Sequence, residues 1–329
     1  MKLYTKQGYL NVEGLLRQSF TFNFLIGGRG TGKTYGVLQY IRNYKLKVFF
    51  IRRQQTQIDI ITKPEFNPFK SIDKNITVDS ASKYHSIFYK NDECIGYAAA
   101  LSTFAKIRGF DASDIDIMFY DEFIPELHER PIKNESAALF NAYETVNRNR
   151  ELQGRPPVIL ICCANSNRID NPILQGFNLL PDLEKLIRTG KELYTDRSRS
   201  VLLAYLQSSP ISKEKSETAL YRAITGSNYS DMSIYNQFGF SADKITSKDL
   251  TQYRIIARIG DIGIYISRQS GTSYYIRATK ETAKYMYKDD ADGLKRFRND
   301  FPMLPILDVK GFVEYESLDI YTRFKQLFE

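Results

Sequence analysis

The feature that most constrains this chain is a glycine-rich segment at residues 27–34, which reads GGRGTGKT. It fits the pattern G-x-x-x-x-G-K-[ST] of a phosphate-binding loop, and it lacks the G-x-G-x-x-G spacing of a dinucleotide fold. An apolar run at residues 21–26 precedes it and a helical stretch at residues 34–41 follows. Glycines let the backbone form a nest of N–H groups around a phosphate, and the helix N-terminus adds its positive dipole end. The motif predicts an ATP site made by Gly27, Gly28, Arg29, Gly30, Thr31, Gly32, Lys33 and Thr34.

A second motif is the apolar run at residues 115–120, which ends in two carboxylates and matches a Walker B strand. We predict that Asp121 holds Mg²⁺ together with the Thr34 hydroxyl, while Lys33 reaches the β- and γ-phosphates. Glu122 would polarise the attacking water as general base. The alternative is a solvated strand end, since acidic residues often follow strands.

The apolar run at residues 158–164 ends at Asn165. A polar residue at such a strand tip can sense the γ-phosphate, and the Asn165 side chain would bond the phosphate or the lytic water. The segment Asn-Ser-Asn at residues 165–167 would equally well start a turn. The run contains Cys162 and Cys163, which we interpret as buried strand residues.

The first half of the chain alternates strand-like and helical segments. Continuous apolar runs at residues 47–51, 115–120 and 158–163 are typical of a parallel sheet covered on both faces by helices. Residues 86–89 and 94–101 flank a predicted hairpin turn, and residues 135–150 have helical spacing. These patterns predict an α/β ATPase domain at residues 1–187.

The amino-acid composition of the chain changes after this domain. Residues 188–230 are polar and are interpreted as a linker subdomain, with short helices at 201–207 and 215–224. From residue 231 to 329 the chain is β-rich, with strands predicted at 253–259, 264–268 and 274–280. Short glycine-containing links between them indicate an antiparallel meander. Helices are predicted near residues 292–300 and 317–328.

Four segments in the first half carry a family resemblance: GGRGTGKT, IDIMFYDEF, TVNRNR at residues 145–150, and ILICCANSN. They resemble the DNA-packaging (encapsidation) ATPases of small podoviral phages of the phi twenty-nine type. The resemblance covers roughly residues 20–182, in the same order and with similar spacing. It implies an additional-strand, catalytic-glutamate P-loop NTPase with a central, mostly parallel sheet.

The resemblance also implies partners. Members form a homo-oligomeric ring, usually a pentamer, at the portal of an empty capsid in the host cytoplasm, and they drive double-stranded DNA inward; some use a packaging RNA. In such rings an arginine of one subunit completes the neighbour's site, and the matching position here is Arg148, with Arg150 as second choice. The alternative is local, because cations near a helix C-terminus bond free carbonyls.

Other cations near the predicted site have open roles. The stretch FAKIRG at residues 104–109 resembles the Lys/Arg-Gly segment that precedes the Walker B strand in phage packaging motors. Lys106 or Arg108 would contact nucleotide in trans, or DNA, and a solvated loop charge fits equally. Arg52 and Arg53 follow the second strand, where they could lie beside the nucleotide.

The C-terminal region invites a comparison with nucleases. Packaging motors often end in an RNase H-like nuclease, which is degenerate in the small-phage family. An active site of that fold needs several carboxylates close together, which bind two metal ions. In this chain Asp261 lies in a predicted turn between two strands and does not belong to such a cluster. We predict a degenerate RNase H-like α+β domain at residues 231–329 that binds nucleic acid without cleaving it. The cations of its strands would track a phosphate backbone or face solvent: Arg254, Arg258, Arg268, Arg277 and Lys280.

The net charge and the apolar content of the chain limit the classes of partner that it is expected to bind. The net charge of +8 favours a polyanion such as DNA. No apolar run approaches the ~20 residues of a membrane helix, so no membrane partner is expected. Three functions other than a packaging motor stay open: a helicase or recombination ATPase, a terminase with an active nuclease, and an adaptor that binds ATP without turning it over.

Overall fold

The computed structural model describes residues 2–107, 112–126, 129, 131–165, 171–207, 209–227, 230 and 244–328. The chain packs into two compact units. The first comprises Met1–Arg168 and Thr189–Gly239, and the second comprises Ile169–Arg188 and Phe240–Glu329. The sequence pattern assigns residues 188–230 to a linker, whereas the first unit includes Thr189–Gly239. The predicted domain boundaries stay a prediction.

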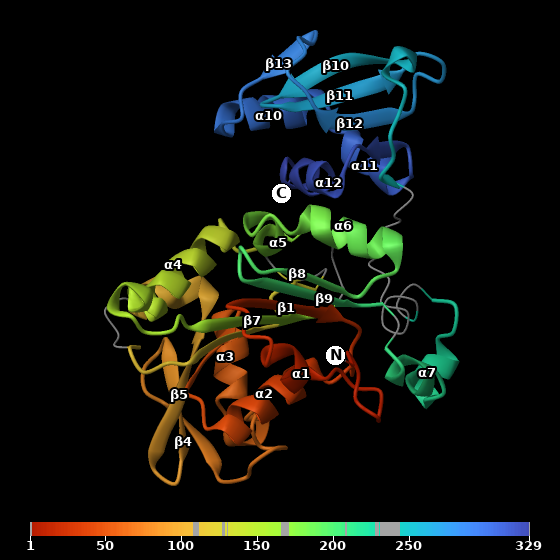
Figure 1. Ribbon diagram of the computed structural model, residues 1–329. Coiled ribbons are helices and arrows are strands. Elements are labelled where there is room, and N and C mark those ends of the chain that lie inside the picture. The colour runs from red at the N-terminus through yellow and green to blue at the C-terminus, as the bar shows by residue number, and fades with distance from the viewer. Residues whose placement is uncertain are drawn as a thin grey trace. The chain divides into compact units, whose positions relative to one another are not determined.

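A large sheet forms the first unit, with nine strands among the described residues in the order β3-β4-β5-β2-β6-β7-β1-β9-β8. The strands from β5 to β9 in this order run parallel, whereas β3, β4 and β8 pair antiparallel at the edges. This confirms the mostly parallel sheet (Figure 1). The strands are β1 (Phe22–Gly27), β2 (Val48–Arg52), β3 (Ile76–Ser80), β4 (His85–Lys90), β5 (Glu93–Ala100), β6 (Ile117–Asp121), β7 (Ile159–Ala164), β8 (Leu193–Asp196) and β9 (Val201–Leu206).

The strand order decides where the motifs meet. Strand β7 lies between β1, which delivers the glycine-rich loop, and β6, which ends at Asp121. An additional strand therefore separates the two motif-bearing strands. Because all three run parallel, their carboxyl ends lie at one edge of the sheet, where ligands bind in open α/β sheets.

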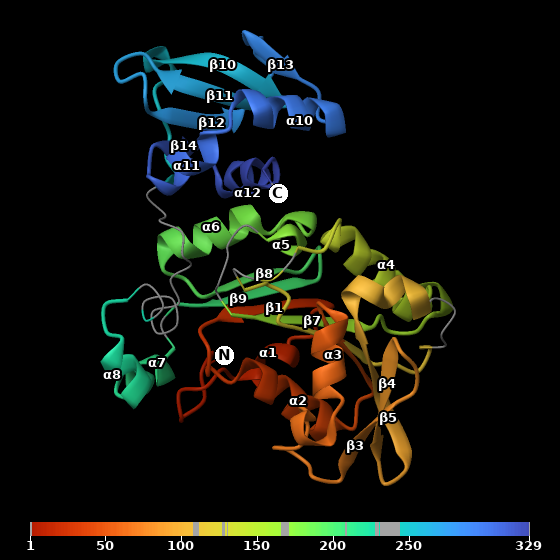
Figure 2. The same cartoon turned by 180° about the vertical axis from the view of Figure 1, so that it is seen from behind.

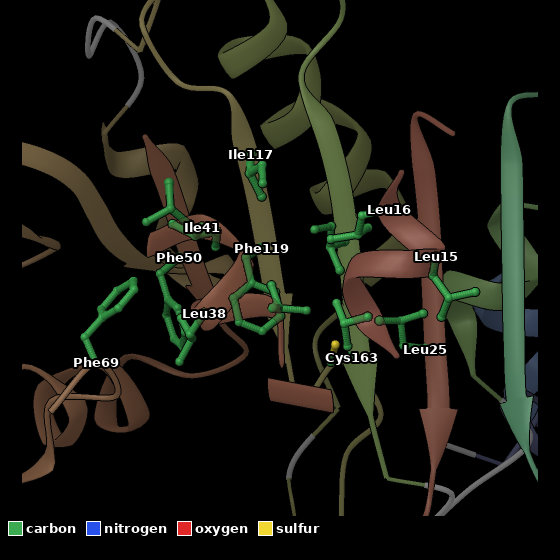
Figure 3. Packing of buried hydrophobic residues seen from close by; sticks show 14 of the residues in the cluster. Leu15, Leu16, Leu25, Leu38, Ile41, Phe50, Phe69, Ile117, Phe119 and Cys163 are labelled. Carbon is green, nitrogen blue, oxygen red and sulfur yellow. The ribbon is translucent and has the colours of Figure 1, made fainter. Parts of the chain in front are cut away.

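Helices cover the faces of this sheet, and Figure 2 shows α1, α2 and α3 together beside it. In the core, Phe50 of β2 and Phe119 of β6 pack with Leu38 and Ile41 of α2 (Figure 3). Each such buried side chain contributes about 1.5–3 kcal/mol. The helices of the unit are α1 (Val12–Leu16), α2 (Lys33–Tyr44), α3 (Gln55–Ile61), α4 (Glu135–Asn147), α7 (Ile211–Ser216) and α8 (Ala219–Ala223), with 3-10 turns η1 (Pro64–Phe66), η2 (Leu101–Ile107) and η3 (Arg150–Gln153).

The predicted hairpin is present in the structure, whereas one predicted helix is a strand. The hairpin between β4 and β5 is confirmed, and its turn residues Asn91 and Asp92 both adopt the left-handed conformation that a two-residue turn requires. The helix predicted at residues 201–207 is wrong, because Val201–Leu206 is strand β9, paired with β1 and buried along its length. A short, continuous apolar run fits a buried helix or a buried strand, and periodicity cannot separate them.

The second unit contains a sheet whose five strands, over the described residues, follow the order β13-β10-β11-β12-β14. The predicted meander is confirmed, since β10, β11 and β12 pair antiparallel. The RNase H likeness of this unit stays a prediction. Its elements are α5 (Pro172–Gly176), α6 (Leu180–Thr189), η5 (Leu250–Gln252), β10 (Tyr253–Ile259), β11 (Ile262–Ser267), β12 (Tyr274–Ala278), β13 (Tyr285–Tyr287), α10 (Ala291–Asp300), α11 (Leu304–Val309), β14 (Val313–Tyr315) and α12 (Leu318–Gln326).

Among the described residues, no helix combines the length and the apolar character needed to cross a membrane.

Candidate nucleotide-binding site

The glycine-rich loop joins the end of β1 at Gly27 to the start of α2 at Lys33. Gly30 and Gly32 have φ angles of 78° and 85°, a conformation that side chains rarely adopt. The Thr31 hydroxyl donates to the Gly28 carbonyl oxygen at 3.0 Å and closes the loop on itself. The strand, loop and helix that the motif predicts are therefore present in the predicted order.

Lys33 points into this loop and is 6% exposed. Its Nζ donates to the carbonyl oxygens of Gly27 and Gly28 at 2.9 and 2.8 Å, and to Thr31 Oγ1 at 3.1 Å. Burial lowers the pKa of Lys33 to about 8. A buried ammonium that donates to neutral oxygens is well placed to receive a phosphate anion.

Thr34 and Asp121 meet across the edge of the sheet. Thr34 Oγ1 donates to Asp121 Oδ1 at 2.9 Å, and Asp121 is 1% exposed. Burial raises the pKa of this carboxyl, while the charge of Arg52 opposes the rise. The loop and the Walker B strand are thus brought together as the two motifs predict.

Arg52 is the residue at this site whose role the sequence leaves open. Its Nη2 lies 2.8 Å from Asp121 Oδ2, and its Nη1 pairs with Glu122. Ile51 pairs with Tyr120 in the parallel register of β2 and β6, so the next residues, Arg52 and Asp121, lie opposite each other. Only the order of the strands could have revealed this contact.

A cavity of about 220 Å³ lies between the loop and the ends of β6 and β7. Asn165 lines it, with Oδ1 at 3.5 Å from Lys33 Nζ. Glu122 also lines it, adopts a left-handed φ of 57° and keeps its side chain 48% exposed. The residues around the cavity are Gly30, Thr31, Gly32, Lys33, Thr34, Tyr35, Asp121, Glu122, Ala164 and Asn165.

The two candidate trans arginines lie away from this cavity. Arg148 caps the C-terminus of α4 with a φ of 41°, and its Nε donates to the Thr145 carbonyl at 3.3 Å. Arg150 is buried and donates to the Ser113 carbonyl at 2.8 Å. Arg150 therefore has a structural role within its own subunit, which leaves Arg148 as the better candidate for a neighbour's site.

Arg53 binds a different part of the first unit and does not line this cavity. Its side chain is fully buried, and Nε and Nη2 bind the two carboxylate oxygens of Glu135 at 2.8 and 2.9 Å. Tyr120 Oη also donates to Glu135 at 2.8 Å. Arg52 and Arg53 are equal candidates from the sequence, but only Arg52 reaches the site. Lys106 donates to Tyr84 Oη at 3.3 Å, and Arg108 and Gly109 lie outside the described residues.

Three of the five cations predicted on the C-terminal strands, Arg258, Arg268 and Arg277, have local partners. Arg258 and Arg277 both lie opposite Gly263 in the sheet register. Arg258 donates to the Lys280 carbonyl at 2.7 Å, and Arg268 donates to the Tyr253 carbonyl at 3.0 Å. Arg277 pairs with Glu316 at 3.3 Å, Arg254 is exposed on β10, and Asp261 pairs with Arg323. Phosphate tracking by these residues stays a prediction.

The chain is similar to known proteins in both sequence and fold. The sequence model of a family described as Podovirus DNA encapsidation protein (Gp16) matches residues 4–303. The DNA packaging proteins of Bacillus phages phi29 and PZA are each 26% identical over 330 residues, covering 95% of this chain and 94% of those proteins. A solved structure of the bacteriophage Phi-29 viral genome packaging motor assembly shares the fold, with 21% identity, 99% of each chain covered and a TM-score of 0.66.

Proposed function

The chain belongs to the Podovirus DNA encapsidation protein (Gp16) family, and we propose that it is the ATP-hydrolysing motor that translocates double-stranded viral DNA into a preformed capsid. One observation carries the enzymatic part of this proposal. Lys33, Thr34 and Asp121 converge at the carboxyl edge of the sheet, around a cavity that the loop backbone wraps. A nucleoside triphosphate with its cation needs this combination of an ammonium, a hydroxyl and a carboxylate.

The donor set fits Mg²⁺. The described residues contain no group of three carboxylate, His or Cys ligands, which is what a dedicated metal cage would need. Mg²⁺ is instead held by one or two protein oxygens plus substrate phosphates and water. Thr34 Oγ1 and Asp121 Oδ1, 2.9 Å apart, are the protein oxygens that would hold it. When bound, the ion neutralises charge on the phosphate oxygens.

Glu122 is the proposed general base. Its carboxylate borders the cavity and pairs with Arg52. We propose that Glu122 leaves Arg52 when nucleotide binds, so that its carboxylate faces the attacking water. Asn165, at the tip of β7 and within reach of Lys33, is proposed to bond the terminal phosphate or the water.

Family membership and the solved packaging motor assembly support a proposal about the partners. We propose a homo-oligomeric ring, a pentamer, that docks at the portal of the procapsid in the host cytoplasm. A packaging RNA is a further proposed partner. In the ring, Arg148 at the end of α4 would reach the neighbour's triphosphate and stabilise charge in the transition state, an effect of ~10³ or more in rate.

The first experiment measures ATP binding and hydrolysis by purified full-length variants. Lys33→Ala should lose both activities. Glu122→Gln should bind ATP and turn it over at least about 100-fold more slowly, as expected when a general base is lost. Normal hydrolysis by Glu122→Gln would rule out the assigned base. Glu144→Gln, an exposed glutamate on α4, is the matched control and should behave as wild type.

The second experiment tests the role of Arg148 in trans. Arg148→Ala is mixed with the hydrolysis-defective Glu122→Gln protein under ring-forming conditions. In mixed rings, an intact Glu122 site can receive Arg148 from its neighbour, so recovered hydrolysis supports the trans role. No recovery, with mixed rings verified by native mass spectrometry, contradicts it. Movement along intact duplex DNA, without strand separation or cleavage, distinguishes packaging from helicase and nuclease activities.

A further inference from the structure

A second lysine reaches the glycine-rich loop from a distant part of the chain. Lys215 lies on α7, and its Nζ donates to the backbone carbonyl oxygen of Arg29 at 2.7 Å. The same Nζ lies 4.7 Å from the ring centroid of Tyr221 on α8. The ammonium group of Lys215 therefore lies against the Tyr221 ring and donates a hydrogen bond to the loop carbonyl.

The start of α7 is fixed to the loop through the N-terminal segment. The buried Ser209 hydroxyl donates to the Gly8 carbonyl at 3.2 Å, and Leu10 N donates to the Thr31 carbonyl of the loop at 2.9 Å. A Cβ on Gly8 would lie 3.1 Å from Pro210 Cβ, so the two segments pack closely. Lys215 is thus presented to the loop by an anchored element.

Two ammonium groups consequently converge on one loop. Lys33 Nζ donates to the carbonyl oxygens of Gly27 and Gly28, and Lys215 Nζ donates to that of the next residue, Arg29. The side chain of Arg29 pairs with Glu126, so that carboxylate is engaged by the loop itself. Like charges bound to successive carbonyls of one loop repel each other, and a polyanion between them would remove the repulsion.

We propose that Lys215 is a second phosphate-binding residue, supplied by the α7–α8 helix pair. When ATP occupies the loop, the Lys215 Nζ leaves the Arg29 carbonyl and binds the triphosphate. The flexible four-carbon stem of lysine lets the charge shift while the helix stays in place. This inference rests on the proposed ATPase function, because it concerns the same loop.

The test measures MgATP affinity by calorimetry with the full-length protein. Lys215→Met removes the charge but keeps an unbranched side chain over Tyr221. Arg222→Met removes one positive charge from the exposed face of α8 and is the matched control. The dissociation constant should rise about tenfold for Lys215→Met, as expected when a charged hydrogen bond is lost. Arg222→Met should stay within about twofold of wild type.

The outcomes separate this inference from the proposed function. If Lys215→Met binds MgATP as tightly as wild type, Lys215 only braces the Arg29 carbonyl and the inference is overturned. If the wild-type protein itself binds no MgATP, the proposed ATPase function fails first. Lys215→Arg keeps a cation within reach and should retain most of the affinity, whereas a loss equal to that of Lys215→Met would contradict a role for the charge.

Discussion

Removal of the Glu135 carboxylate should destabilise the first unit strongly, because it leaves a buried arginine without its main partner. Arg53 is fully buried, and Glu135 binds two of its three guanidinium nitrogens. Glu129 binds the third at 2.9 Å and is itself only 21% exposed. Tyr120 Oη also depends on Glu135 as its acceptor.

The size of the effect follows from these contacts. Breaking a buried ion pair on one side costs about 3–5 kcal/mol, since the remaining charge is uncompensated. Glu129 still neutralises part of the charge on Arg53, so Glu135→Leu belongs at the lower end, about 3 kcal/mol. In the double variant Arg53→Met, Glu135→Leu the buried guanidinium is gone, and the partly exposed Glu129 keeps its hydrogen bond from Gln57. The orphaned Tyr120 hydroxyl then leaves a cost of about 1–2 kcal/mol.

The assay is urea unfolding of the full-length protein, followed by far-ultraviolet circular dichroism. Glu144→Leu, on the exposed face of the same helix, is the control and should change the unfolding free energy by less than about 0.5 kcal/mol. The reasoning would be refuted if Glu135→Leu unfolded like this control. It would also fail if the double variant were no more stable than Glu135→Leu alone.

Three further predictions concern other parts of the chain. Burial alone would raise the pKa of Asp308, but hydrogen bonds from Lys244 and Lys325 hold it below its ordinary value of 3.8. The second unit should therefore lose stability as pH falls below about 4, and Asp308→Asn should flatten that loss in an acid titration of unfolding. Gly293→Ala should lower the stability of this unit by about 2 kcal/mol, because the added Cβ would lie 2.0 Å from the Lys288 carbonyl oxygen; an unchanged melting temperature would contradict it. A maleimide should label the partly exposed Cys94 in the native protein. Cys162 and Cys163 should react only after unfolding, because burial shields both thiols and raises their pKa. Mass spectrometry of the labelled protein measures the difference.

The sequence could predict the parts of the site that a continuous motif encodes. The loop, its strand and its helix follow from one stretch of eight residues, and Asp121 follows from a buried strand ending in acid. The strands that carry these two segments run parallel in one sheet, so their carboxyl ends lie at the same edge and bring the loop and Asp121 together. The centre of the site is therefore encoded by two short segments, whose residues carry the phosphate-binding and cation-binding groups.

Contacts set by strand order could not be predicted in this way. Arg52 reaches Asp121 because β2 lies next to β6, and nothing in the sequence states that adjacency. Lys215 reaches the loop from 186 positions away in the chain. The helix prediction at residues 201–207 fails because the run is apolar at nearly every position, whereas its place beside β1 decides its conformation.

The neighbours Arg52 and Arg53 have separate contacts at the end of β2. Arg52 is the last residue of the strand and joins the acidic pair Asp121 and Glu122, whereas Arg53, in the bend that follows, binds Glu135 at the first turn of α4. Arg148, the residue proposed to serve the neighbouring subunit, caps the other end of α4. The end of β2 and the bend after it therefore contact both the acidic pair and the first turn of α4. In the proposed motor, a shift of Arg52 on ATP binding would act next to the residue that anchors α4, and it would thereby connect the ATP site with the proposed trans arginine.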